Sequence, residues 1–141
     1  MPRIRLFAIT VLLIAFAAAA CGGGSADTTS SSVSDVMFSR GSVPETVPES
    51  FPIPEEAVVG ATLVDPARNV TEMILTFPAD TAAVVDYYEQ SLPPLGFTIL
   101  SSDGSETVWR IVFSDSDADG EMGVQAAGSG IAAATVQFSE R

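Results

Sequence analysis

The 141-residue chain contains no histidine and no lysine, and its only cysteine is Cys21. Without histidine, neither a Ser-His-Asp triad nor a Cys-His pair can form. Without lysine, the chain has no Schiff-base amine and no phosphate-loop lysine. A single cysteine cannot form a disulfide within the chain, so the fold must depend on its apolar core. Of the common catalytic chemistries, these absences leave only that of carboxylates.

Positive charge is also scarce, because six arginines face 18 aspartates and glutamates, and the formal net charge is −12. Removal of the first 20 residues takes away Arg3 and Arg5, which leaves four basic and 18 acidic residues and a charge of −14. Such a surface repels phosphate backbones, so we predict no nucleic-acid partner. The charge keeps the protein solvated or, alternatively, docks it onto a cationic partner.

The N-terminus has the layout of a secretory signal peptide. Arg3 and Arg5 precede an apolar run over residues 6–20 that only Thr10 interrupts. A helix that crosses a bilayer needs about 20 apolar residues, so this run of about 15 is short for a permanent span. Small residues end the run, and Cys21 follows them directly.

The segment Ala18-Ala19-Ala20-Cys21 resembles the lipobox of bacterial lipoproteins. In that family the cysteine thiol receives a diacylglycerol and becomes the new N-terminus. The resemblance implies a palmitate-bearing protein that Cys21 anchors in the bilayer, on the extracytoplasmic face of the cell membrane. An ordinary secretory signal with a chance cysteine and a retained membrane helix are the two alternatives.

We expect three parts in the chain. Residues 1–21 form the signal peptide and lipobox. Residues 22–50 form a tether that is first rich in Gly, Ser and Thr and then rich in proline, with a small apolar island at residues 36–38. Residues 51–139 form one small domain.

Hydrophobic periodicity predicts an α+β domain. Residues 70–77 place apolar side chains at every second position, as a half-buried strand does. Asp80 caps one helix, and Pro93 and Pro94 end it. Further strands are expected over residues 57–64, 97–100, 107–113, 122–126 and 131–138. Short turns between them imply a two-layer antiparallel sheet of about six strands with one covering helix, in the order β-β-α-β-β-β-β.

Three short segments of this domain carry a second resemblance: Phe51-Pro52-Ile53-Pro54, residues 86–92 (DYYEQSL) and Leu95-Gly96-Phe97. They are similar to small uncharacterised envelope lipoproteins of high-GC Gram-positive bacteria. In these proteins a proline-rich lead enters a hairpin, and a helix then runs through glycine and an aromatic residue into a strand. The similarity covers roughly residues 51–113 and implies an architecture without an activity.

One acidic segment has the spacing of a metal loop. Residues 115–120 (DSDADG) match the first half of the Asp-x-Asp-x-Asp-Gly calcium loop, in which alternate residues supply hard oxygen ligands. The candidate ligands are Asp115, Asp117, Asp119 and the adjacent Glu121, and calcium binding would be weak. The twelfth position, which should carry a bidentate glutamate, is Ala126. The alternative is a solvated hairpin loop in which Asp and Gly form the turn.

Tyr87 is the aromatic residue that we expect to point partly outward from the helix. It is a candidate partner-binding residue or, alternatively, a residue that shields the rim of the core. We therefore predict a membrane-anchored lipoprotein that is not an enzyme and needs no cofactor, and whose domain binds an unknown envelope protein. One alternative is a module that binds calcium or a small envelope molecule. A carboxylate-based hydrolase is a remote alternative, since it needs two acidic groups across a cleft.

Overall fold

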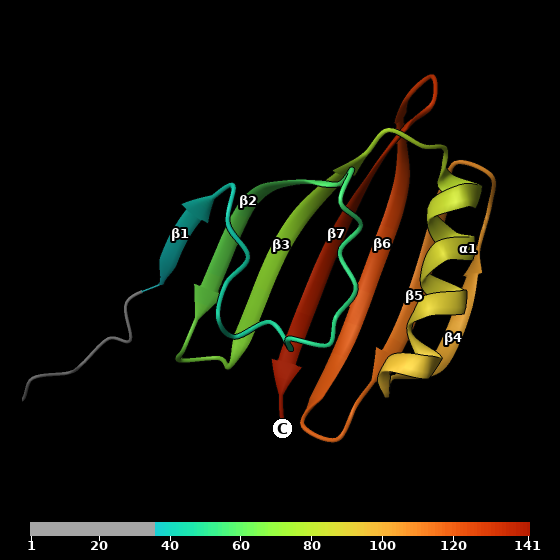
Figure 1. Ribbon diagram of the computed structural model, residues 1–141. Coiled ribbons are helices and arrows are strands. Elements are labelled where there is room, and N and C mark those ends of the chain that lie inside the picture. The colour runs from blue at the N-terminus through green and yellow to red at the C-terminus, as the bar shows by residue number, and fades with distance from the viewer. Residues whose placement is uncertain (1–35) are drawn as a thin grey trace, which may run out of the picture. The chain divides into compact units, whose positions relative to one another are not determined.

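The computed structural model describes residues 36–141, which form one antiparallel sheet of seven strands with a single helix (Figure 1). The strand order is β1-β2-β3-β7-β6-β5-β4. This is the α+β class that the sequence predicts, with one strand more than the six expected. The signal peptide, Cys21 and residues 22–35 of the expected tether lie outside the described residues.

The strands are joined in meanders on either side of the helix. The first three are β1 (Met37–Arg40), β2 (Val58–Asp65) and β3 (Val70–Phe77), and helix α1 (Thr81–Ser91) with the short 3₁₀ turn η1 (Pro93–Leu95) follows them. The last four are β4 (Thr98–Gly104), β5 (Val108–Ser114), β6 (Ala118–Gly128) and β7 (Ile131–Glu140). The last strand returns to the middle of the sheet and pairs with both β3 and β6.

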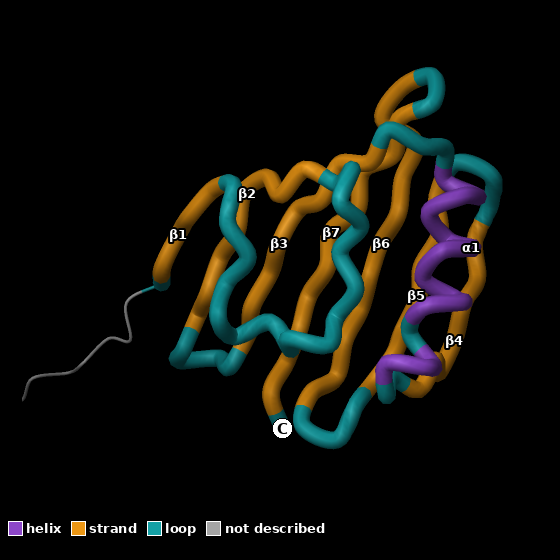
Figure 2. Tube along the Cα trace, viewed as in Figure 1, coloured by secondary structure: helices purple, strands orange, loops and turns teal. Residues whose placement is uncertain are grey.

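The folded part begins well before residue 51, so the expected extent of the tether needs correction. Met37–Arg40 pairs with β2, and Val47 and Phe51 are buried. The connection over residues 41–57, here called the strap, crosses one face of the sheet (Figure 2). The Thr46 hydroxyl is hydrogen-bonded to the Thr71 hydroxyl at 2.5 Å. The proline-rich segment is not an extended lead into the domain. It turns at Pro44, Pro48 and Pro54, whose carbonyls accept hydrogen bonds from the backbone N–H groups three residues further on, and it packs on the sheet.

Strand β6 also begins earlier than expected, at Ala118 instead of residue 122. Its inward positions are Ala118, Gly120, Met122 and Val124, all of which are buried. The acidic residues between them point outward, where water solvates them. Backbone pairing with β5 and β7 on both sides therefore overrides the turn preference of Asp and Gly.

Helix α1 forms where the sequence predicts it. The Asp80 carboxylate accepts a hydrogen bond from the Ala83 backbone N–H at 2.8 Å, and so caps the first turn. Its inner stripe, which is buried, consists of Val84, Val85, Tyr88 and Leu92. The two prolines end the α-helix and continue as η1. The helix packs against β5, β6 and β7, on the face of the sheet that the strap also crosses (Figure 1).

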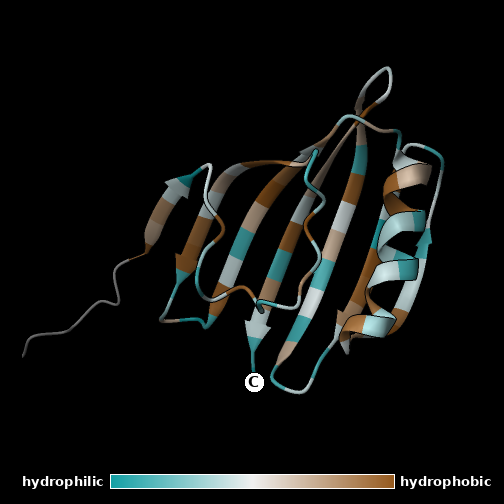
Figure 3. Ribbon diagram, viewed as in Figure 1, coloured by the Kyte–Doolittle hydropathy of each residue, from teal (hydrophilic) through white to brown (hydrophobic). Residues whose placement is uncertain are grey.

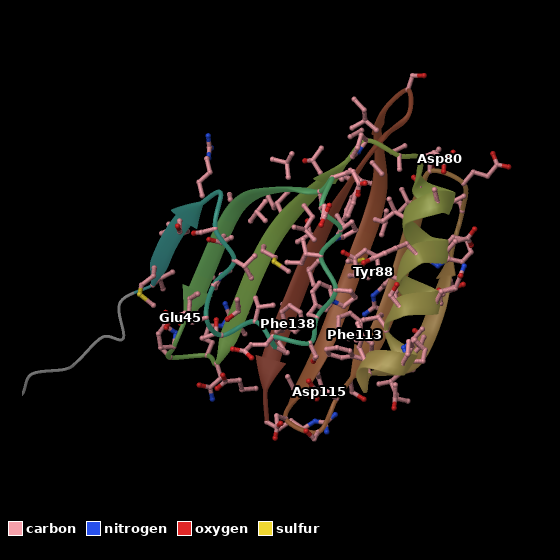
Figure 4. All side chains as sticks on the ribbon, viewed as in Figure 1. Glu45, Asp80, Tyr88, Phe113, Asp115 and Phe138 are labelled. Atoms are coloured by element: carbon pink, nitrogen blue, oxygen red, sulfur yellow. The ribbon has the colours of Figure 1, made fainter. Side chains whose placement is uncertain are left out.

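An aromatic cluster joins strap, helix and sheet. Phe51 from the strap stacks on Tyr88 of α1, with ring centroids 5.6 Å apart, and on Phe113 of β5 at 5.7 Å. Its ring also meets Phe138 of β7 edge-on at 5.0 Å. Figure 4 labels three of these residues, Tyr88, Phe113 and Phe138. Polar and apolar bands alternate along the central strands, so the opposite face of the sheet is the polar one (Figure 3).

Candidate functional site

The acidic segment 115–121 forms a turn followed by a strand. The Asp115 carboxylate accepts hydrogen bonds from the backbone N–H groups of Asp117, at 2.8 Å, and Ala118, at 2.7 Å. This local bonding is how aspartate closes a turn. Asp115 thus holds the chain as it enters β6.

The remaining two candidate calcium ligands are bound to arginines on the polar face. Glu121 accepts two hydrogen bonds from Arg110, at 2.6 and 2.7 Å, and Asp119 is paired with Arg141. In each pair the hydrogen bond from the guanidinium, together with its charge, lowers the pKa of the carboxyl below its ordinary value. Each arginine therefore already satisfies one carboxylate.

The structure does not bring the four predicted calcium ligands together. Within residues 36–141 no three acidic side chains are grouped as a metal site would require. The physical reason is the early start of β6, since it places Asp119 and Glu121 on a strand and leaves Asp115 and Asp117 in the preceding turn. The geometry fits the hairpin alternative, and calcium binding by this segment stays a prediction.

Acidic residues from distant parts of the chain do meet at this end of the sheet. A hollow of about 490 Å³ is lined by residues that include Glu45 and Glu49 of the strap, Asp115, Asp117 and Glu140. Arg141 lines it too. Sequence reasoning missed this gathering, because residues 45–49 were expected in a tether.

Tyr87 points partly outward from α1, as expected, with 37% of its surface exposed. Its ring meets Tyr88 edge-on at 5.1 Å. It lines an apolar hollow of about 340 Å³ together with Phe77, Pro78 and parts of the strap and helix. This arrangement agrees with both readings of Tyr87, as a binding residue and as a residue at the rim of the core.

A third hollow opens between α1 and the turn that joins β4 to β5. We call it the helix–hairpin hollow. Its volume is about 430 Å³. Its walls are Thr81, Ala82, Val85, Asp86 and Glu89 of the helix and Gly104, Ser105, Glu106 and Trp109 of the hairpin. Its lining thus combines apolar side chains with three carboxylates, those of Asp86, Glu89 and Glu106.

Hydrogen bonds fix two walls of the helix–hairpin hollow relative to each other. The Trp109 indole N–H donates to the Ser102 hydroxyl at 2.8 Å, and that hydroxyl donates to the Glu89 carboxylate. This chain links β5, β4 and α1. Thr81 is 3% exposed, and its hydroxyl has no hydrogen-bond partner among the described residues. Buried hydroxyls are normally hydrogen-bonded, so a hydroxyl without a partner in the wall of this hollow is unusual.

Strand β1 forms one edge of the sheet and carries two exposed apolar side chains. Among the described residues it pairs only with β2. Met37 is 56% exposed and Phe38 is 77% exposed. Natural sheets usually protect such edges with charges, prolines or a covering segment, because an open edge can pair with another chain.

The register of β1 shows which of its backbone groups do not bond to β2. The Gly41 N–H donates to the Gly60 carbonyl at 3.0 Å, and Arg40 lies opposite Ala61. Hydrogen-bonded pairs alternate along two antiparallel strands. The N–H and C=O groups of Phe38 and Arg40 therefore point away from β2, toward the open edge.

No protein-family model, curated protein or solved structure matches this chain. The described residues contain no helix that is long and apolar enough to cross a membrane. The expected lipid anchor, Cys21, lies outside these residues.

Proposed function

We propose that the protein is a lipoprotein anchored at the cell membrane, whose domain binds another envelope protein outside the cytoplasm and catalyses no reaction. The N-terminal pattern that ends at Cys21 supports the anchor. The lack of histidine and lysine supports a binding role, because it removes most nucleophilic and general-base chemistry.

The observation that carries the binding role is the open edge at β1. A strand whose outward N–H and C=O groups pair with no other strand of residues 36–141, and which exposes Met37 and Phe38, can accept an extended segment of a partner as an additional strand. Main-chain hydrogen bonds would then supply affinity, and the two apolar side chains would supply selectivity. We infer an extended segment with apolar side chains as the partner's contribution.

Photo-crosslinking in the native membrane tests this role. A photoreactive residue at Val36, beside the β1 edge, should give one discrete adduct with a partner protein. The same residue at Leu100, which is 60% exposed on the β4 edge, is the matched control and should not give that adduct. Adducts that are identical from both edges, or absent from Val36, would contradict the proposal.

Phe38→Pro tests whether strand addition is the mode of binding. Proline at this position removes an N–H that points away from β2, so the pairing of β1 with β2 is retained. The adduct from Val36 should then disappear, while Thr98→Pro on the opposite edge should leave it unchanged. Persistence of the adduct in Phe38→Pro would mean that neither the N–H nor the ring of Phe38 holds the partner, which would contradict strand addition at this edge.

Ligand binding is the second candidate function, and the helix–hairpin hollow favours it. The hollow combines an aromatic side chain, a group of carboxylates and a buried hydroxyl without a partner. Apolar hollows with a few convergent polar groups are where small molecules bind.

A further inference from the structure

The helix–hairpin hollow has the composition of a site for an organic cation. Trp109 lines it from β5, and Asp86 and Glu89 line it from α1. Glu106 approaches from the turn between β4 and β5. We propose that the hollow binds a small organic ammonium ion, which lies against Trp109 and among these three carboxylates. The inference rests on the second candidate function and does not depend on the β1 edge.

The charge of the hollow is not compensated within the described part of the chain. The three ion pairs of residues 36–141 use Arg68, Arg110 and Arg141, and their partners are Asp65, Glu121 and Asp119. None of these residues lines the hollow. Three carboxylates without a protein cation favour a positively charged ligand, since opposite charge relieves their mutual repulsion.

The aromatic wall decides between a metal ion and an organic cation. A hard metal ion needs several converging oxygens, and the described residues contain no such group. A quaternary or primary ammonium ion is attracted instead to the face of an indole ring, with carboxylates nearby. The surrounding apolar wall of Ala82 and Val85 suits alkyl groups on the nitrogen.

The site is built in advance of binding. Trp109 is partly buried against the core, and its N–H is held by Ser102, which is itself bonded to Glu89. The ring and one carboxylate therefore keep their relative positions without a ligand. The unpartnered hydroxyl of Thr81, on the same wall as Asp86, offers an acceptor to a ligand that carries a polar hydrogen.

The test uses choline and its neutral isostere 3,3-dimethyl-1-butanol, which differ in charge but hardly in shape. The full chain, in nonionic detergent, is titrated with each while the emission of Trp109 is recorded, since this is the only tryptophan in the protein. Choline should shift the emission with saturation, and the alcohol should bind at least tenfold more weakly. Calorimetry provides an independent affinity.

Glu89→Gln should weaken choline binding about tenfold, because the amide oxygen still accepts the hydrogen bond of Ser102 while the charge is lost. Glu49→Gln is the matched control, since it changes net charge equally at the other end of the sheet, and it should leave the affinity unchanged. Equal binding of both probes, absence of saturable binding, or an equal effect of both substitutions would overturn the proposal. Phe38→Pro should not alter choline binding, so failure of this site and failure of the β1 edge are distinguishable.

Discussion

At the scale of single residues, Tyr88 is the clearest case of a polar group in an apolar place. It is fully buried, and its hydroxyl has no hydrogen-bond partner among the described residues. Burial raises the pKa of this phenol well above its ordinary range, and the neighbouring Tyr87 adds to the effect. The ring contributes to the core through its contacts with Phe51 and Phe77, whereas the hydroxyl costs free energy there.

Tyr88→Phe should therefore be neutral or stabilising by up to about 1 kcal/mol in urea unfolding at neutral pH. The difference in the free energy of unfolding between Tyr88→Phe and the unsubstituted protein should grow at alkaline pH. The folded phenol holds its proton more tightly than the unfolded one, so its contribution to stability is present below pH 10 and is lost as the pH rises above it. The free energy of unfolding of Tyr88→Phe should fall less between pH 9 and pH 11. Tyr87→Phe is the control and should retain most of the alkaline loss.

Gly120 supplies a second prediction at this scale, because it makes room for a core aromatic ring. A methyl group at this position would overlap the ring of Phe113, which is 1% exposed. Gly120→Ala should cost about 1–3 kcal/mol in urea unfolding. Gly123→Ala on the same strand is the matched control, since nothing lies within 4 Å of its added carbon, and it should stay within about 0.5 kcal/mol. Similar costs for both would mean that the ring of Phe113 moves aside.

At the scale of elements, the spacing of the apolar residues correctly predicted the secondary structure of segments that have one buried and one solvated face. Strand β3 and helix α1 are of this kind, since their buried side chains recur at every second position and at helical spacing. Asp80 and the two prolines mark the ends of the helix because capping and the loss of a backbone donor are local effects.

The strap and β1 could not be predicted in this way. A four-residue edge strand shows no period, and all four residues of β1 are exposed. Proline spacing indicates an extended chain, whereas the segment turns at three of its prolines. Its packing on the sheet depends on residues far along the sequence, such as Phe113 and Phe138. The helix–hairpin hollow could not be predicted from the sequence for the same reason, because its walls come together only when α1 lies beside the β4–β5 turn.

This difference leads to a prediction about the strap. A chain that begins at residue 51 lacks β1 and buried Val47, whereas one that begins at residue 36 retains both. Burial of one valine contributes about 1.5–3 kcal/mol, so the shorter chain should lose at least this much in urea unfolding. The longer chain should match the full-length protein. Equal urea midpoints for the two shortened chains and the full-length protein would mean that residues 36–50 act as a tether and do not stabilise the domain.

At the scale of the whole molecule, the acidic surface and the expected lipid have opposite effects on binding to the membrane. From residue 21 onward the chain has a formal charge of −14, so anionic headgroups repel it. One acyl chain binds a bilayer only marginally, whereas two hold a protein stably. If the lipobox resemblance is correct, the diacylglycerol on Cys21 must supply all of the attachment.

Cys21→Ser should therefore move nearly all of the protein from the membrane pellet to the soluble fraction and abolish labelling by palmitate. Ser25→Ala, four residues further on, should change neither. Retention of unlabelled Cys21→Ser in the pellet would instead favour a membrane helix over residues 6–20. Because the substitution lies outside residues 36–141, the free energy of unfolding of the domain should be unchanged, which separates loss of the anchor from loss of the fold.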